Sequence, residues 1–590
     1  MGRYVGIDLG TTNSIVSVAN KTYHGEIEAE TLRVAQVDER GLGIVELEDL
    51  PSVLYVEENG DNYVGRYAKR MSSVYKTRVI KESKSHLGTN DKWKIDGKEY
   101  TPDKIASFFL SILKKQVEKY YNGEQVDSAV ITIPANFHFQ QQQETRNAGI
   151  LAGFDAKKIH LLPEPTAALI DFLNEEEKLA PEARRLNLAN GPKKLLVFDL
   201  GGGTCDVSIL QVEENTSRRL SITELSISQY TKLGGRDFDQ HVAQYLFTKY
   251  CMDMGLSLRD IRSNYEEHVF LSLLESFIDI AENAKKRFSS MVLAAGVDYY
   301  ANPAQFDQKS YTEMLPTHLP EQLISRVTIT KKELDKAIEP LLYKDLNKGT
   351  NIEAPIMSAL ADARLGAMTI DDIDAVFLVG GMTYYPTVQN RLYEIFNRRI
   401  KPLQSINPMI SVSRGAAIYH QRLQDINLGV AKPGQEPKDP INVGVETTVP
   451  VNVFIDVKGS TPIPLLEKGT KLPVEKEFDG KFCVSGVHSG IANVTTMKLE
   501  LFTAASATAI STKRLKEATL EFSKPVKAGT PLVLHVACNA ERDVTVRAWI
   551  KNAPDEMIAV NIGAKDYSAK DIATIQDEHN KTVAEETLLK

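Results

Sequence analysis

IDLGTTNS at residues 7–14 and FDLGGGTCDVS at residues 198–208 are two versions of one pattern. In each, an apolar strand ends in Asp-Leu-Gly, and the chain continues through small residues and threonines. The two copies are separated by about the length of a domain. A repeat at that distance indicates two duplicated halves that face each other.

Both loops have the chemistry of a metal and phosphate site. Glycine lets the backbone pass close to phosphate oxygens and offers N–H donors that no side chain obstructs. Threonine adds hydroxyl donors, and aspartate suits a hydrated Mg²⁺ ion, which keeps most of its waters. A single Asp-x-Gly would more often be a β-turn, but two in tandem favour the phosphate site. The residues concerned are Asp8, Gly10, Thr11, Thr12, Asp199, Gly201, Gly202, Gly203, Thr204 and Asp206.

Two further glycine loops follow expected strands, LGGRDFD at residues 233–239 and GGMT at residues 380–383. Either one alone could be a hairpin turn or the start of a helix. The sequence contains no GxxxxGK[ST], which excludes a P-loop ATPase. It also lacks a GxGxxG that opens a helix after a strand with an acidic residue about twenty positions on, so a dinucleotide-binding fold is disfavoured.

Up to about residue 425, apolar strands alternate with amphipathic helices, the pattern of an α/β domain. The expected strands include Val126–Pro134, Lys194–Leu200 and Ile373–Val379, and the expected helices include Asp103–Tyr120 and Leu271–Phe288.

A polar segment with several prolines, Gly429–Pro440, is typical of a linker. After it come short alternating strands, which include Thr495–Phe502, Pro531–Ala537 and Val544–Ile550 and are typical of a β-sandwich. The final charged stretch Ala569–Lys590 is expected to be helical, at roughly 33 Å too short for a helical bundle. The predicted parts are residues 1–428, the α/β domain; 429–440, the linker; 441–566, the β-rich domain; and 567–590, a helical tail.

Composition and charge argue against two classes of partner. The net charge of −8 gives no basic face for nucleic acid. No run of about 18 apolar residues occurs and the N-terminus lacks the apolar stretch of a signal peptide, so we expect a cytoplasmic protein without a membrane partner.

Six motifs occur in order along the chain: IDLGTTNS, AVITIPANF, PEPTAA, FDLGGGTCDVSIL, LGGRDFD and LVGGMTYYP. This series resembles the seventy-kilodalton heat-shock chaperones. PINVGVET at residues 440–447 resembles, more weakly, the start of that family's peptide-binding domain. The resemblance implies an actin-like ATPase domain of two duplicated lobes followed by a β-sandwich. It also implies ATP and Mg²⁺ as cofactors, slow ATP hydrolysis, and unfolded or extended polypeptide as partner, with co-chaperones or a nucleotide-exchange factor. We expect a monomer.

The resemblance also implies roles for individual residues. Lys84 would position the attacking water, because an ammonium near the γ-phosphate stabilises charge without moving a proton. The implied catalytic residues are Lys84, Glu164, Asp199 and Thr204, and Asp8, Asp199 and Asp206 would hold the metal through water. The implied nucleotide-binding residues are Gly10, Thr11, Thr12, Asn13, Gly201, Gly202, Gly203, Thr204, Gly234, Gly235, Glu282, Lys285, Lys286, Ser289, Gly380, Gly381, Met382 and Tyr384. Within this set Glu282 would bind the ribose.

The chain departs from the family's pattern at the base of the nucleotide. The family commonly holds adenine between two arginines, and Lys286 and Tyr384 stand at those positions. Lysine stacks on a purine less well than a guanidinium, whereas tyrosine stacks well. Asn13 replaces a tyrosine, Ser85 replaces an arginine and Met409 replaces an acidic residue.

A second departure concerns the coupling of the two domains. The family's linker carries an acidic and leucine-rich run that docks on the ATPase domain, but KPGQEPKDP at residues 432–440 has no leucine. The family's long helical lid is also missing. We therefore predict that ATP changes peptide affinity by less than about fivefold, below the usual range of allosteric coupling.

Two questions stay open at this level. Met497 and Leu499, with Leu501 on the same strand face, could line a peptide groove, or they could point into the sandwich core. The chain could also be an actin-superfamily scaffold or filament ATPase whose β-domain binds one dedicated partner. A sugar or acid kinase is disfavoured, because a kinase would not need the C-terminal β-domain.

Overall fold

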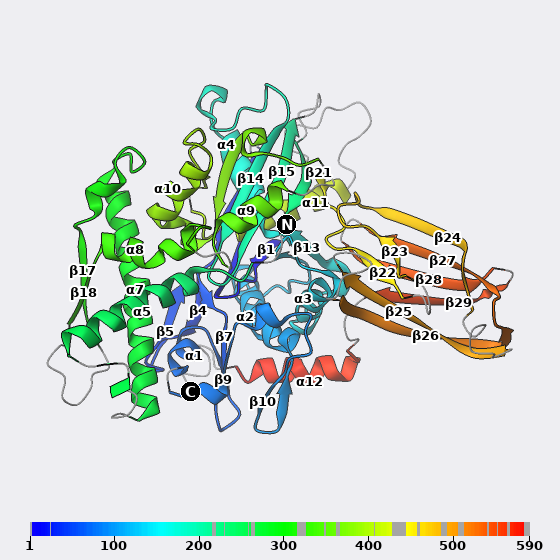
Figure 1. The fold of residues 1–590 in the computed structure, drawn as a ribbon. Helices are drawn as coiled ribbons and strands as arrows, with labels where there is room; N and C mark the ends of the chain where they lie inside the picture. Colours follow the sequence, from blue (N-terminus) through cyan, green and yellow to red (C-terminus); the bar gives the residue numbers. More distant parts are fainter. Residues whose placement is uncertain are drawn as a thin grey trace.

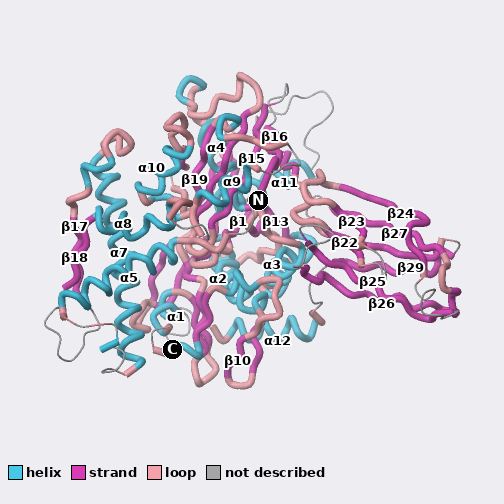
Figure 2. Tube along the Cα trace, viewed as in Figure 1, coloured by secondary structure: helices cyan, strands magenta, loops and turns pink. Residues whose placement is uncertain are grey.

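The computed structural model describes most of the chain (Figures 1 and 2). The described residues are 3–23, 25–72, 74–214, 220–228, 231–255, 257, 259–260, 266–315, 326–346, 350–361, 366–405, 407–427, 444–456, 461–484, 493–504, 512–539, 542–551, 553–562 and 567–582. The predicted linker, residues 429–440, lies outside them. Figure 2 shows a part with mixed helices and strands, from which an all-strand part projects to one side.

The first sheet has the strand order β13–β12–β1–β2–β3, with β6 paired to β2. β1 pairs with β12, and β12 with β13, in parallel, whereas β1–β2 and β2–β3 are antiparallel. β12 is buried at every position, in agreement with its mainly apolar sequence AVITI. The strands are β1 (Tyr4–Asp8), β2 (Asn13–Lys21), β3 (Ile27–Thr31), β6 (Leu50–Pro51), β12 (Ala129–Ile133) and β13 (Ile159–Pro163).

The second sheet has the order β20–β19–β14–β15–β16–β21. β14 pairs in parallel with β19, and β19 with β20, whereas β14–β15 and β15–β16 are antiparallel. Its first five strands therefore repeat the order and directions of the first sheet. The strands are β14 (Lys193–Leu200), β15 (Cys205–Glu214), β16 (Leu220–Ile227), β19 (Ala375–Val379), β20 (Leu403–Gln404) and β21 (Gly444–Glu446).

We call residues 3–163 the first lobe and residues 193–405 the second lobe. In the first lobe, α2 begins with proline after Thr101, a favourable first position because proline lacks the N–H that would be unpaired there. The remaining elements of the first lobe are α1 (Arg66–Met71), α2 (Pro102–Tyr120), α3 (Phe139–Leu151), β4 (Val34–Val37), β5 (Ile44–Leu47), β7 (Val53–Val56), β8 (Asn62–Val64), β9 (Val79–Lys81), β10 (Trp93–Ile95) and β11 (Lys98–Tyr100). Those of the second are α5 (Gly235–Asp253), α7 (Glu267–Ala295), α8 (Lys331–Leu342), α9 (Glu353–Leu360), α10 (Pro386–Ile395), β17 (Ser310–Met314) and β18 (Arg326–Thr330).

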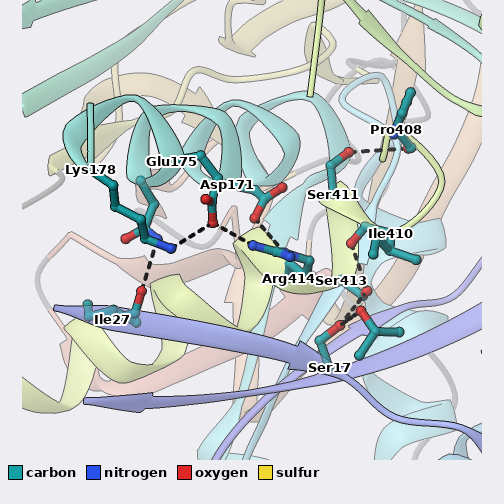
Figure 3. A network of polar contacts seen from close by, with 12 residues as sticks. Ser17, Ile27, Asp171, Glu175, Lys178, Pro408, Ile410, Ser411, Ser413 and Arg414 are labelled. Carbon is teal, nitrogen blue, oxygen red and sulfur yellow. Dashed lines mark hydrogen bonds and ion pairs between the residues drawn. The ribbon is translucent and has the colours of Figure 1, made fainter. Parts of the chain in front are cut away.

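Two helices lie between the lobes, α4 (Glu164–Glu177) and α11 (Ser411–Asn427). They pack on each other, and α11 also packs on β1 and β2. Figure 3 shows how polar contacts hold them. Arg414 of α11 pairs with Asp171 and Glu175 of α4, at 2.8 and 2.6 Å. Ser413 bonds to Ser17 of β2 at 2.8 Å. α4 is thus fixed against the first sheet, and its first residue is the predicted site residue Glu164.

The β-domain consists of two four-stranded sheets with one shared apolar core (Figure 1). One sheet has the order β23–β22–β25–β26 and the other β24–β27–β28–β29. The strands are β22 (Val453–Ile455), β23 (Ile463–Leu466), β24 (Val474–Cys483), β25 (Asn493–Ala504), β26 (Thr512–Lys527), β27 (Pro531–Cys538), β28 (Val544–Ile550) and β29 (Ala553–Ile562). Sheets that share a buried face in this way form a sandwich.

The β-domain touches both lobes directly, a contact that the linker expected from the sequence did not predict. Arg542 bonds to Glu224 of the second lobe at 2.9 and 3.1 Å and to the Ala135 carbonyl of the first lobe at 3.0 Å. Phe139 of α3 belongs to the same apolar cluster as the sandwich core. β21, from the predicted start of the β-domain, extends the second sheet by pairing with β16. The two domains therefore share polar, apolar and strand contacts.

The predicted tail forms the helix α12 (Ala569–Asn580), and residues 583–590 lie outside the described part. Figure 1 shows α12, in red, along the edge of the first lobe below α2. In the described part of the chain, no helix has the length and apolar character needed to cross a membrane.

Candidate active site

The two repeated loops meet where β1 and β14 end. A Cβ atom added to Gly202 would lie 2.0 Å from the Thr12 hydroxyl oxygen, so only glycine permits this approach. The loop at residues 233–239 joins them, because the Gly235 N–H donates to the Gly201 carbonyl at 2.9 Å. Two of the predicted loops, at residues 7–14 and 233–239, thus each contact the loop at residues 198–208.

The fourth loop, at residues 380–383, lies beside Asp199. β19 runs parallel to β14 with Val379 opposite Asp199, which brings the following turn to the carboxylate. Gly380 has a φ of +84°, and a Cβ there would lie 2.6 Å from a carboxylate oxygen of Asp199. Both the left-handed backbone and the close contact require glycine at this position.

Four carboxylates gather at this junction: Asp8, Glu164, Asp199 and Asp206. Burial, followed by the charge of Glu164, raises the pKa of Asp8 and of Asp206 to about 7. Burial and the neighbouring carboxylates raise the pKa of Asp199 well above its usual range. Carboxylates this close and this buried repel one another unless positive charge is added.

Lys84 supplies one positive charge to the cluster. Its ammonium forms an ion pair with Glu164, and its side chain is 8% exposed. Burial alone would lower the pKa of Lys84, but the charges of Glu164 and Asp8 outweigh burial and raise it. One ammonium among four carboxylates leaves the site short of positive charge, so it fits a divalent cation.

The donor set suits an ion held through water. Among the described residues, no group of three His, Cys, Asp or Glu side chains has the geometry of a direct metal site. Asn136, which the sequence analysis left without a role, donates to Asp206 at 2.5 Å. Its carbonyl oxygen is buried without a hydrogen-bond partner in the described structure and is free to accept from an ordered water. Asn136 lies within AVITIPANF, so the motif itself could have indicated it.

The predicted nucleoside residues of α7 divide into two groups. Lys285 is buried, and its ammonium donates to the Gly235 carbonyl at 2.9 Å and pairs with Asp239 at 2.8 Å. It also lies 3.4 Å from the Met382 sulfur, so it joins α7 to two of the glycine loops. Lys286 pairs instead with Glu282 at 2.6 Å, and its side chain is 70% exposed. The ammonium of Lys285 therefore makes its contacts with the protein itself, whereas the side chain of Lys286 faces solvent.

Two further nucleoside residues are held by the protein. The Ser289 hydroxyl donates to the Lys285 carbonyl at 2.9 Å. Tyr384 ends the short 3-10 helix Gly381–Tyr384, and its hydroxyl donates to Asn407 at 2.9 Å. This bond fixes the half-buried tyrosine ring beside the fourth loop.

A protein-family model described as Hsp70 protein matches residues 91–590. The chain belongs to the Hsp70 family. Its curated relatives include Chaperone protein DnaK from Thermosipho melanesiensis, 33% identical over 475 residues, which is 80% of this chain and 66% of that protein. The proteins of the same name from Thermotoga neapolitana and Thermotoga maritima are each 34% identical with the same coverage. This Hsp70 chain thus aligns with slightly less than two thirds of the length of these relatives.

The first loop of this Hsp70 chain, residues 7–14, precedes the region that the family model matches. Its place in the site rests on its contact with Gly202 and on the burial of Asp8 beside Glu164.

The peptide-groove candidates Met497 and Leu499 lie inside the sandwich. Each is 6% exposed and belongs to the core shared by the two sheets. Leu501 of the same strand is also buried. These positions correspond to the core alternative of the sequence analysis, and they offer no open surface to a peptide in this arrangement.

Proposed function

We propose that this Hsp70 chain binds and hydrolyses ATP with Mg²⁺ where its glycine loops meet. The observation that carries the proposal is the buried group of four carboxylates with a single ammonium, surrounded by those loops. Such a group would be strongly unfavourable without a bound cation.

The backbone N–H groups of the loops would bind the phosphates, and the hydroxyls of Thr11, Thr12 and Thr204 would add donors. Asp8, Asp199 and Asp206 would hold waters around the ion, with the Asn136 carbonyl as a further acceptor. Bound Mg²⁺ would neutralise charge on the phosphate oxygens. Lys84 would stabilise charge near the γ-phosphate and position the attacking water, and Glu164 would hold the Lys84 ammonium in place.

We also propose that the two matching sheets are duplicated lobes of an actin-like ATPase domain, with domain limits near residues 428 and 440. The shared strand order and directions support this. The remaining loop residues would complete the nucleotide site: Asn13, Gly10, Gly201, Gly203, Gly234, Gly381 and Met382. Tyr384 would stack on the adenine with Lys286 on the opposite face, and Glu282 would bind the ribose.

The names of the relatives support a chaperone role, in which the β-domain binds unfolded or extended polypeptide. Co-chaperones or an exchange factor would then act on this chain, and we propose that it works as a cytoplasmic monomer. The proposal is tested by titrating a fluorescent extended apolar peptide into the intact chain with ATP and with ADP. Saturable peptide binding by a monomer, together with ATP hydrolysis, is the expected result. ATP-dependent sedimentation of polymers without peptide binding would contradict the chaperone role and favour a filament ATPase.

A further inference from the structure

The helix α12 packs on the surface of the first lobe, and its contacts come from α2, α3 and β8. His579 of α12 is 3% exposed, and its Nε2 lies 2.9 Å from the hydroxyl of Ser107 in α2. The imidazole also packs edge-on against Phe108, with 4.6 Å between the ring centres. A buried histidine with both a polar and an aromatic partner indicates a specific docking position.

Both ends of α12 are held by the first lobe. Before the helix, the Tyr567 hydroxyl donates to the buried carboxylate of Asp103 at 2.8 Å. At its C-terminal end, the Asn62 side chain of β8 donates to the Glu578 carbonyl at 3.2 Å. The Asn62 N–H donates to the Lys581 carbonyl at 3.3 Å. The last carbonyls of a helix have no partner within it, so Asn62 acts as a cap supplied by another domain.

The connection to the β-domain is short. Only residues 563–566 separate β29, the last strand of the sandwich, from Tyr567. Five residue steps span at most about 18 Å, so docking of α12 confines the end of β29 to that distance from the backbone of Tyr567. Arg542 holds the same end of the domain against Glu224 and Ala135, since Val544, two residues after it, pairs with Ile562 at the end of β29. The two attachments meet different parts of the lobes, Asp103 of α2 in one case and Glu224 with Ala135 in the other, so together they restrict the β-domain more than a single tether would.

We propose that α12 is a clasp that keeps the β-domain against the first lobe, and that its binding site is the surface formed by α2, α3 and β8. The occupant is this segment of the chain itself, residues 567–582. The contacts that hold it join protein groups outside the proposed nucleotide site, so the clasp stands apart from the proposed ATPase activity.

His579 makes the clasp sensitive to pH. Burial, with a smaller contribution from Lys115, lowers the pKa of His579 to about 4. The charged groups on the elements around it are Lys115, the partly exposed ion pair between Lys98 and Glu578, and Asp103 with its Tyr567 partner. The docked imidazole is neutral, whereas a released one would take up a proton below a pKa of about 6.5. Docking of α12 is therefore strongest above pH 6.5 and weakens as the pH falls towards 4. At pH 5 the equilibrium constant for docking should be about 30-fold lower.

Hydrogen exchange of the intact, nucleotide-free chain tests the clasp. At pH 7.5 the amides of residues 569–580 should be protected, and His579→Ala should reduce their protection at least tenfold. The matched variant Lys570→Ala, at an exposed position of the same helix, should leave it unchanged. Unprotected amides in the wild type, or equal protection in His579→Ala, would overturn the proposal.

Two further measurements guard against a folding defect in the variant. After correction for the intrinsic exchange rates of the amides, lowering the pH from 7.5 to 5 should reduce the protection of α12 about 30-fold in the wild type. It should not do so in His579→Gln, which cannot titrate.

The second measurement uses one dye on the exposed Cys483 and another at Lys94→Cys. The distribution of distances between the two dyes should become broader when His579 is replaced by alanine. An unchanged distribution, with α12 released, would show that the helix does not restrain the β-domain. ATP hydrolysis is not measured, so failure here leaves the proposed function standing.

Discussion

Replacing Arg542 with alanine tests how the β-domain is held against the ATPase domain. The guanidinium makes two bonds to Glu224, at 2.9 and 3.1 Å, and one to the Ala135 carbonyl. The two charged side chains are 3% and 4% exposed. Removing one member of a buried pair leaves the other charge without compensation, which costs about 3–5 kcal/mol. We expect Arg542→Ala to lower the free energy of unfolding of the docked β-domain by that amount.

Tryptophan fluorescence provides the assay, because the chain has two tryptophans. Trp549 lies in β28 of the β-domain and Trp93 in β10 of the first lobe. In a Trp93→Phe background, urea unfolding followed at Trp549 reports the β-domain transition. The double variant Arg542→Met/Glu224→Leu removes both charges and should recover most of the lost stability.

A nearby arginine serves as the control. Arg547 is exposed on β28, and Arg547→Ala should change the free energy of unfolding by less than about 0.5 kcal/mol. If Arg542→Ala also costs less than about 1 kcal/mol, as an exposed pair would, the β-domain is not held through this contact and the reasoning fails.

Three further predictions concern the nucleotide and the peptide. Tyr384→Ala should weaken ATP binding by about 1–3 kcal/mol in calorimetry, the contribution of one aromatic–base stack; unchanged affinity would remove Tyr384 from the adenine. Gly202→Ala places a methyl group 2.0 Å from the Thr12 hydroxyl oxygen and should separate the two loops, so ATP affinity should fall at least tenfold while the circular dichroism spectrum stays the same; wild-type affinity would show that the loops need not touch. Peptide dissociation constants measured with ADP, and with ATP on an Asp199→Asn background, should differ by less than about fivefold. The clasp and Arg542 give this weak coupling a second reason besides the leucine-free linker, and a tenfold difference would contradict it.

Elements with a clear local pattern could be predicted from the sequence. The strand at Val544–Ile550 was predicted with the bounds that β28 has, because apolar and polar residues alternate between two turns. The helix predicted at Leu271–Phe288 extends over Glu267–Ala295, since helix ends depend on capping and packing more than on periodicity. Alternation also showed that Met497 and Leu499 share a strand face. It could not show which face would be covered by the second sheet, and the structure places them in the core.

The gathering of the loops could be predicted because the motifs themselves imply it. Asp8 and Asp199, from the two copies of the repeated pattern, are close enough for their charges to interact, and Gly380 lies beside Asp199. The contacts between domains could not be predicted, since they join residues that no local pattern relates. Arg542 and Glu224 are 318 positions apart, and Ser107 and His579 are 472 apart. From the sequence alone, the two residues of each pair would be predicted to be polar residues on the surface.

Phosphate release from Mg-ATP by the wild type, Lys84→Ala and Asp199→Ala tests the central claim most directly. ATP binding by calorimetry and thermal unfolding would be measured on the same samples. The account predicts slow hydrolysis by the wild type and a reduction of about 10²-fold in each folded variant, the effect of losing one electrostatic stabiliser. Wild-type turnover in either folded variant would remove that residue from the site, and a wild-type chain that binds no ATP would contradict the account as a whole.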